Sequence, residues 1–67
     1  MTTEQSAELQ NTLEEMMSRI NTGDDITEQL LLIKRISADI EASAPKMLTH
    51  YLERRSYAKA LDFLKDL

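Results

Sequence analysis

The sequence has no cysteine, which excludes disulfide bonds, thiolate catalysis and cysteine-based metal sites. It has one glycine, one proline and three aromatic residues, none of which is tryptophan. Its longest apolar run, from Leu30 to Ile33, is far shorter than the roughly 20 residues that span a membrane. The polar N-terminal segment does not resemble a signal peptide. We therefore expect a cytoplasmic protein without covalent cross-links.

The residues that are present favour helices, because Glu, Leu, Ala, Lys and Met are all good helix formers. The 67 residues are enough for one domain, and a domain of this size buries only about 60% of its extended surface. Its stability must come from tight helix packing or from oligomerisation. We predict an all-α fold in a single domain, residues 1–67. It is a small three-helix bundle whose third helix is bent or broken near Arg54–Ser56, or a set of four short helices.

The first predicted helix covers residues 3–21. Thr2 or Thr3 can cap its N-terminus, and Gly23 can adopt the left-handed conformation that ends a helix. Its apolar residues alternate four and three positions apart, which is typical of one buried helix face. They are Leu9, Leu13, Met16 and Ile20, with Met17 beside them. We expect this face to pack in the core.

The second predicted helix covers residues 25–43, and Asp25 with Glu28 forms a capping-box pattern at its start. Its main apolar face spans about 120° of the helix. That face consists of Ile26, Leu30, Ile33, Ile36, Ile40 and Ala44, with Leu32 at its margin. A weaker stripe on the opposite side consists of Leu31, Ala38 and Ala42. The stripe is either ordinary surface or a contact with the C-terminal segment or a second copy of the chain.

The last third of the chain has two apolar faces. Pro45 disfavours helix at the residue before it and suits the first position of a new helix. The first face then consists of Met47, Leu48, Tyr51 and Leu52. The second, roughly opposite on a continuous helix, consists of Tyr57, Ala60, Leu61, Leu64 and Leu67. A break gives helices over 45–54 and 56–67, with Ser56 as N-cap, and directs both faces to one core. The alternative is one long helix with two partners, favoured by the absence of glycine at the junction.

Residues 47–64 contain the ordered series Met47-Leu48, Tyr51, Arg55-Ser56-Tyr57, Ala60 and Leu64. This series resembles the inner part of a tetratricopeptide repeat, in which one helix ends in a Tyr-containing turn and the next carries a small Ala. The repeat usually has a small or flexible residue where Arg55 stands, and no second copy follows at a period of about 34 residues. The resemblance implies a helix–turn–helix shape and says little about ligands.

The net charge of −4 is unevenly distributed. Residues 1–28 have seven acids and one base, giving −6, whereas residues 29–67 have seven bases and five acids, giving +2. Packing the acidic first helix against residues 29–67 adds little to the free energy of folding, because exposed ion pairs contribute only about 0.2–1 kcal/mol each. The basic part includes a line of cationic residues, Lys46, His50 and Arg54, with Arg55 and Lys59 nearby. This line is either a solvated edge or a phosphate-binding strip, and the acidic chain disfavours specific nucleic-acid binding.

The sequence offers little for catalysis, since its one histidine, His50, has no cysteine to activate and no second histidine for a metal. We expect no enzyme activity, cofactor, metal, membrane or small-molecule substrate. The expected function is a protein–protein interaction or structural module that binds a helix or a second copy of itself. The candidate partner-binding residues are Leu31, Ala38, Ala42, Tyr57 and Phe63. The alternative is an accessory nucleic-acid or phosphate-binding protein that uses Lys46, His50, Arg54, Arg55 and Lys59.

Overall fold

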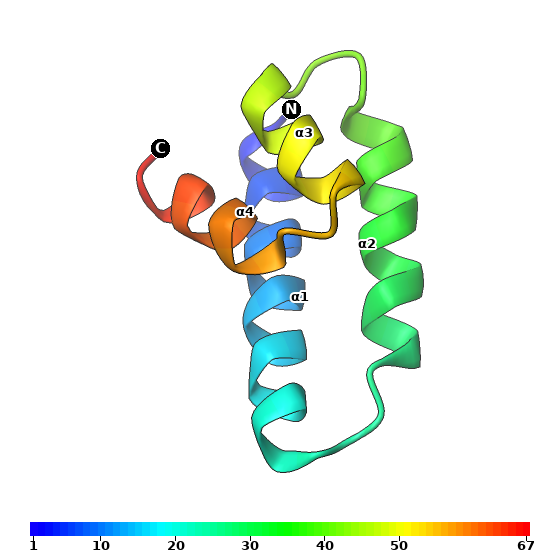
Figure 1. The fold of residues 1–67 in the computed structure, drawn as a ribbon. Coiled ribbons are helices and arrows are strands. Elements are labelled where there is room, and N and C mark those ends of the chain that lie inside the picture. Colours follow the sequence, from blue (N-terminus) through cyan, green and yellow to red (C-terminus); the bar gives the residue numbers. More distant parts are fainter.

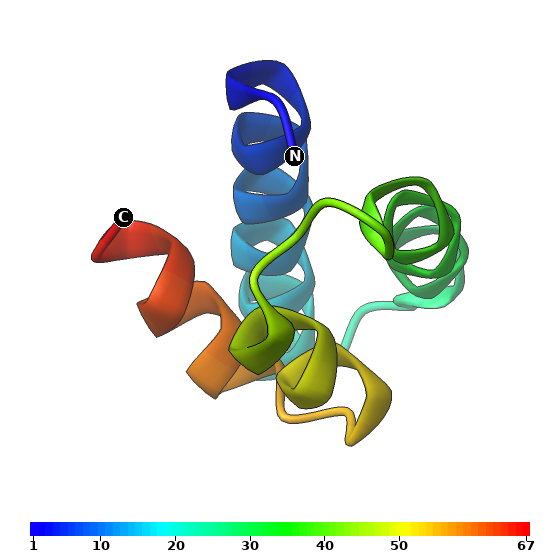
Figure 2. The ribbon, with the colours of Figure 1, turned by 90° about the horizontal axis from the view of Figure 1, so that it is seen from above.

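The computed structural model describes all 67 residues and contains four α-helices and no strands. They are α1 (Thr3–Thr22), α2 (Thr27–Ile40), α3 (Lys46–Glu53) and α4 (Tyr57–Lys65). Figure 1 shows α1 and α2 running in opposite directions, with α3 and α4 covering the part of α1 near the N-terminus. Seen from above, α3 lies between α4 and α2 (Figure 2). The predicted all-α fold is confirmed, with the last third of the chain divided into two short helices.

Helix α1 begins and ends with the local signals expected from the sequence. The Thr2 hydroxyl accepts the Gln5 backbone N–H at 3.1 Å, and the Gln5 side chain accepts the Thr2 N–H at 2.9 Å. This reciprocal capping box satisfies two donors that a helix start leaves unpaired. At the other end Gly23 has φ 79°, and the Asp24 N–H donates to the Arg19 carbonyl at 2.9 Å. Both predicted end signals are confirmed, and the helix runs one residue further than expected.

The start of α2 differs from the prediction. Asp25 does not form a capping box with Glu28; its Oδ1 accepts the backbone N–H of Thr27 at 3.1 Å and the Thr27 hydroxyl at 2.7 Å. Because α2 begins at Thr27 with Ile26 at the cap position, Glu28 lies too early in the helix to complete the box. The Thr27 hydroxyl and N–H hold the pKa of the Asp25 carboxyl below its ordinary value.

The end of α2 also differs, because the helix stops at Ile40 and not at residue 43. The N–H groups of Ser43 and Ala44 both donate to the Ile40 carbonyl, at 2.9 and 2.7 Å, in a tight turn. Pro45 follows, and its ring disfavours a helical Ala44. Helix α3 begins at Lys46, so Pro45 immediately precedes the first helical residue and does not occupy that position.

The predicted break after α3 is confirmed. Arg55 has a left-handed backbone, with φ 58°, and its N–H donates to the Leu52 carbonyl at 3.2 Å. The next N–H, from Ser56, donates to the Tyr51 carbonyl at 2.8 Å. These two bonds satisfy carbonyls in the last turn of α3. Ser56 occupies the N-cap position of α4, but its side chain makes no capping hydrogen bond, which corrects the role expected for its hydroxyl.

A single hydrophobic core joins all four helices. Its buried apolar residues are Leu9, Leu13, Met16, Ile33, Ile36, Ile40, Leu48, Leu52, Ala60, Leu61 and Leu64. Tyr51 packs against this cluster, and its ring meets the Phe63 ring edge-on with centroids 6.4 Å apart. The buried apolar residues of α3 and α4 therefore face a common core, which a continuous helix does not allow.

Four residues of the predicted apolar faces lie at the surface. They are Ile20, Leu30, Met47 and Leu67, which are 52%, 39%, 51% and 68% exposed. Ile20 lies in the last turn of α1, beyond the part that α3 and α4 cover (Figure 1). On α2 the buried face is rotated relative to the predicted one, so that Gln29 is buried and its Oε1 has no hydrogen-bond partner. Burial of the Gln29 side chain without a hydrogen-bond partner lowers the stability of the fold. The rotated buried face of α2 also leaves Leu30 at the edge of a groove.

Candidate functional site

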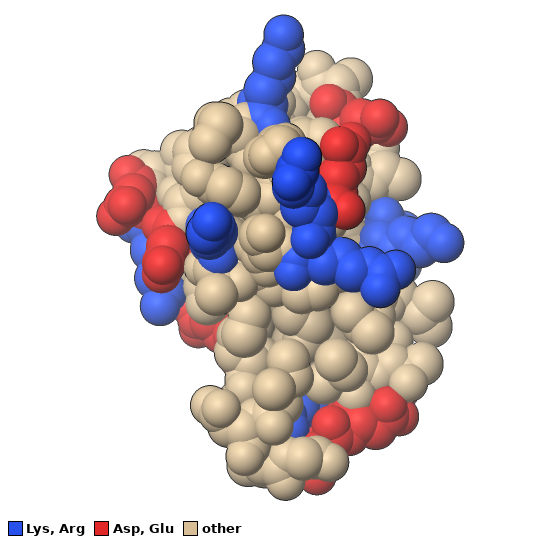
Figure 3. Space-filling view, in the orientation of Figure 1, with Lys and Arg blue, Asp and Glu red and all other residues tan.

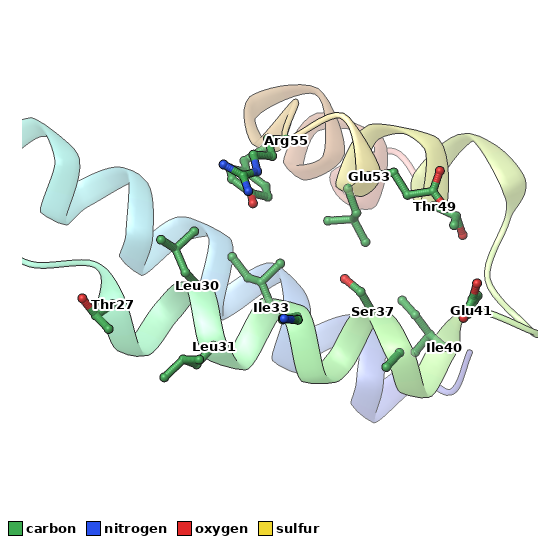
Figure 4. Close-up of a pocket in the computed structure, with 14 residues that line it drawn as sticks. Thr27, Leu30, Leu31, Ile33, Ser37, Ile40, Glu41, Thr49, Glu53 and Arg55 are labelled. Atoms are coloured by element: carbon green, nitrogen blue, oxygen red, sulfur yellow. The ribbon is translucent and has the colours of Figure 1, made fainter.

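A groove with a volume of about 610 Å³ separates α2 from α3 and the following turn. Figure 4 shows side chains from both sides of this groove. The α2 side consists of Thr27, Leu30, Leu31, Ile33, Lys34, Ser37, Ala38, Ile40 and Glu41. The other side consists of Thr49, Leu52, Glu53, Arg55 and Tyr57. Half of these residues are hydrophobic, and the buried Ile33, Ile40 and Leu52 give the groove an apolar base, whereas its rim is mixed.

The groove is open because α2 and α3 have no extensive packing contact with each other. Helix α2 packs along α1, and α4 packs on both α1 and α3, but no comparable contact joins α2 to α3. The residues that face this gap from α2 include the short Ser37 and Ala38, whereas α3 presents the polar Thr49 and Glu53. Side chains this short or polar do not fill the space with apolar contacts.

Charges at the rim are separated along the groove. Lys34 lies at the middle of α2, Arg55 lies across the groove near Ile33, and Glu41 lies at the C-terminal end of α2 (Figure 4). None of these three side chains forms an ion pair. The two ion pairs of the structure lie elsewhere, and all four of their side chains are substantially exposed. They are Glu15–Arg19 at 3.4 Å and Glu8–Arg35, which joins α1 to α2, at 3.8 Å. The rim charges are therefore free to interact with a bound molecule.

The structure brings together three of the five candidate partner-binding residues. Leu31, Ala38 and Tyr57 all line the groove, and Leu31 is 63% exposed. Ala42 is exposed but lies beyond the groove. Phe63 is half-buried against the core beside Tyr51 and lies outside the groove.

Sequence reasoning missed Leu30, Ser37 and Arg55 as groove residues. The sequence places Leu30 in the core, because it falls on the predicted apolar face of α2, and Ser37 gives no apolar signal. The sequence groups Arg55 with the cationic residues, although it also lines the groove. The adjacent pair Leu30–Leu31 is the signal that was available, since two neighbouring leucines cannot both face one narrow core.

The five residues of the phosphate-binding alternative all lie at the surface. Lys46 and His50 lie on α3, Arg54 directly follows its last residue, and Arg55 and Lys59 lie in and after the turn. None of the five forms an ion pair. Figure 3 shows Lys and Arg side chains projecting over this part of the molecule, with acidic side chains beside them. The cationic surface is therefore present but interrupted by negative charge.

No group of three His, Asp or Glu side chains is arranged to hold a metal ion. None of the four helices is both long enough and apolar enough to cross a membrane.

No protein-family model, curated protein or solved structure matches the chain. The segment from α3 to α4 has a helix–turn–helix shape, and this shape alone connects it with the tetratricopeptide resemblance.

Proposed function

We propose that this protein is a non-catalytic helical interaction module that binds an α-helix of another protein molecule in the groove between α2 and α3. The observation that carries the proposal is the exposure of Leu30 and Leu31 at the edge of a groove with an apolar base. An amphipathic helix binds by placing its apolar side chains in such a groove, while its polar side chains remain in water. The cytoplasmic location expected from the sequence belongs to the same proposal.

The shape and chemistry of the groove support a helical ligand. Its apolar base, which includes Ile33, Ile40 and Leu52, extends beneath the rim over about two turns of α2. A helix presents apolar residues at intervals of three and four positions, which matches a groove that runs along another helix. The polar residues that line the groove are Ser, Thr, Lys, Arg and Glu, and His50 is not among them. The groove therefore suits binding more than proton-transfer chemistry.

Site-specific cross-linking tests this function. We place a photoreactive amino acid at Ala38, which is exposed in the groove, and at Asn11, which is exposed on α1 outside it. Each variant is irradiated in the native cell, and the adducts are identified by mass spectrometry. We expect protein adducts from position 38 and not from position 11, and a second substitution, Leu31→Glu, should reduce them. Absence of an adduct at position 38, or equal labelling at both positions, contradicts the proposal.

The second candidate function is phosphate binding by Lys46, His50, Arg54, Arg55 and Lys59, favoured by the absence of acidic partners for all five. The dependence of binding affinity on salt concentration distinguishes the two functions. Binding to a polyphosphate or nucleic acid should weaken steeply as salt rises, whereas association through an apolar groove should persist. Titration with inorganic polyphosphate at low and high salt measures this difference. A salt-sensitive complex that Arg54→Glu abolishes and Leu31→Glu leaves intact would support the second function.

A further inference from the structure

The outer edge of the groove has a regular pattern along α2. Five exposed residues that line it follow one another at intervals of four, three, four and three positions. They are Thr27, Leu31, Lys34, Ala38 and Glu41. This spacing places side chains on one strip of a helix and is the spacing with which two helices pack along each other. The strip lies away from the buried residues Ile33, Ile36 and Ile40, and its five residues are exposed, so no element of the chain covers it.

The charges on this strip are complementary to those on an identical strip that runs in the opposite direction. Lys34 and Glu41 are seven residues, or two helical turns, apart, with the small Ala38 between them. Rotation by 180° about an axis near Ala38 places each Lys34 close to the Glu41 of a second copy. A parallel arrangement instead places Lys34 near Lys34. The second charge pair of the groove has the same order, because Arg55 lies closer to Ile33 and Glu53 lies closer to Glu41 (Figure 4).

We propose that the helix bound in this groove is α2 of a second copy of the chain, lying antiparallel to α2 of the first. This inference rests on the proposed function of the groove. A two-fold contact uses the same patch on both copies, so a patch must carry both charges in reversed order to pair with itself. The same rotation places Leu31 of each copy opposite Ala44 of the other, just after the end of α2, and Ala38 near the axis allows the two backbones to approach closely. A 67-residue domain without cross-links gains stability from such a contact.

Charge exchange tests the antiparallel pairing. Wild-type protein should sediment at twice the 7.7 kDa mass of one chain. The K34E variant places two carboxylates at each contact, and E41K places two ammonium groups there, so each should weaken dimerisation by about tenfold or more. The double variant K34E/E41K restores opposite charges and should dimerise like wild type. An equal mixture of the two single variants should form mixed dimers, detected by native mass spectrometry.

Matched controls separate local pairing from net charge. K65E and E14K change exposed residues outside the groove and give the same net charges as K34E and E41K. Both should dimerise like wild type, because their charges lie away from the contact. Circular dichroism should show equal helix content in all five variants.

Three results overturn the antiparallel pairing. They are a wild-type protein that stays monomeric up to about 1 mM, single variants that dimerise unchanged, and a double variant that is not rescued. Cross-linking at position 38 decides the proposed function separately. An adduct with a different protein, together with a monomeric pure chain, rejects self-pairing and supports the proposed function. Absence of any adduct rejects both.

Discussion

Helices α1 and α3 each end in a turn with the same backbone hydrogen-bond pattern, but the left-handed residue differs between the two turns. In each turn, the N–H groups of a left-handed residue and of its successor donate to carbonyls of the preceding helical turn. Gly23 has φ 79° and Arg55 has φ 58°. Glycine adopts this conformation freely, whereas a residue with a Cβ pays roughly 1–2 kcal/mol for it. The difference raises the question of what holds Arg55 in place.

The surroundings of the two turns answer this question. A Cβ added at Gly23 would meet nothing within 4 Å, and the nearby Ile20 is largely exposed. The first turn is therefore specified by its own residues. The second turn lies between the buried Leu52 of α3 and the buried Leu61 of α4. Burying an apolar side chain stabilises a protein by about 1.5–3 kcal/mol, and burial on both sides of the turn exceeds the strain at Arg55. Tertiary packing thus imposes the second turn.

The largest predicted effect follows from this difference. Leu61→Ala should destabilise the protein by about 2–5 kcal/mol, because it removes a buried side chain on which the second turn depends. Ile20→Ala, near the first turn, should change stability by no more than about 0.5 kcal/mol, as is usual for surface positions. Urea unfolding of both variants, followed by circular dichroism, measures the two values. Equal destabilisation would show that the two turns depend on packing to the same degree.

These two turns also show what the sequence reveals. A glycine followed by polar residues marks the first turn, because its signal is local. The second turn is visible only through the apolar faces on either side of it, which meet at one core if the chain breaks between them. Arg55 itself gives no signal, since arginine is a good helix former and its left-handed conformation results from distant contacts.

The same reasoning explains why the groove was only partly predicted. Periodicity identifies Ile33, Ile36 and Ile40 as core residues, and all three are buried in the hydrophobic core. It placed Leu30 in the core as well, although the buried position belongs to Gln29. A helix wheel gives the width of an apolar face but not where the neighbouring helix ends. The groove forms because α3 is short and has no extensive packing with α2. The residues around Leu30 in the sequence indicate neither of these two features.

A reciprocal pair of substitutions at the left-handed residues should have a smaller effect. Arg55→Gly should stabilise the protein by about 1 kcal/mol, because glycine relieves the positive φ. Gly23→Ala should destabilise it by about the same amount, through backbone conformation alone, since its Cβ meets open space. Thermal unfolding at matched protein concentration gives both signs. If Arg55→Gly destabilises the protein, the arginine side chain itself holds the turn.

The smallest effect concerns the side chains that follow the two turns. After the first, Asp25 accepts the hydroxyl and N–H of Thr27, and after the second, the Ser56 side chain makes no capping bond. Ser56→Ala should therefore leave stability nearly unchanged, whereas Asp25→Ala should loosen the first turn of α2. Hydrogen exchange of the amides in the first turns of α2 and α4 distinguishes these outcomes.

The Asp25 contact should also depend on pH. The Thr27 hydroxyl and N–H lower the pKa of Asp25 in the folded protein, so the carboxylate contributes stability above its unfolded pKa of about 4. That contribution is lost as pH falls through the lowered folded pKa. An NMR titration of the Asp25 carboxyl carbon should give a midpoint below that of an unstructured peptide. Thr27→Ala removes the hydroxyl donor, which is the largest cause of the shift, and should raise the midpoint. The same midpoint in both proteins would mean that the hydroxyl does not bind the carboxylate in solution.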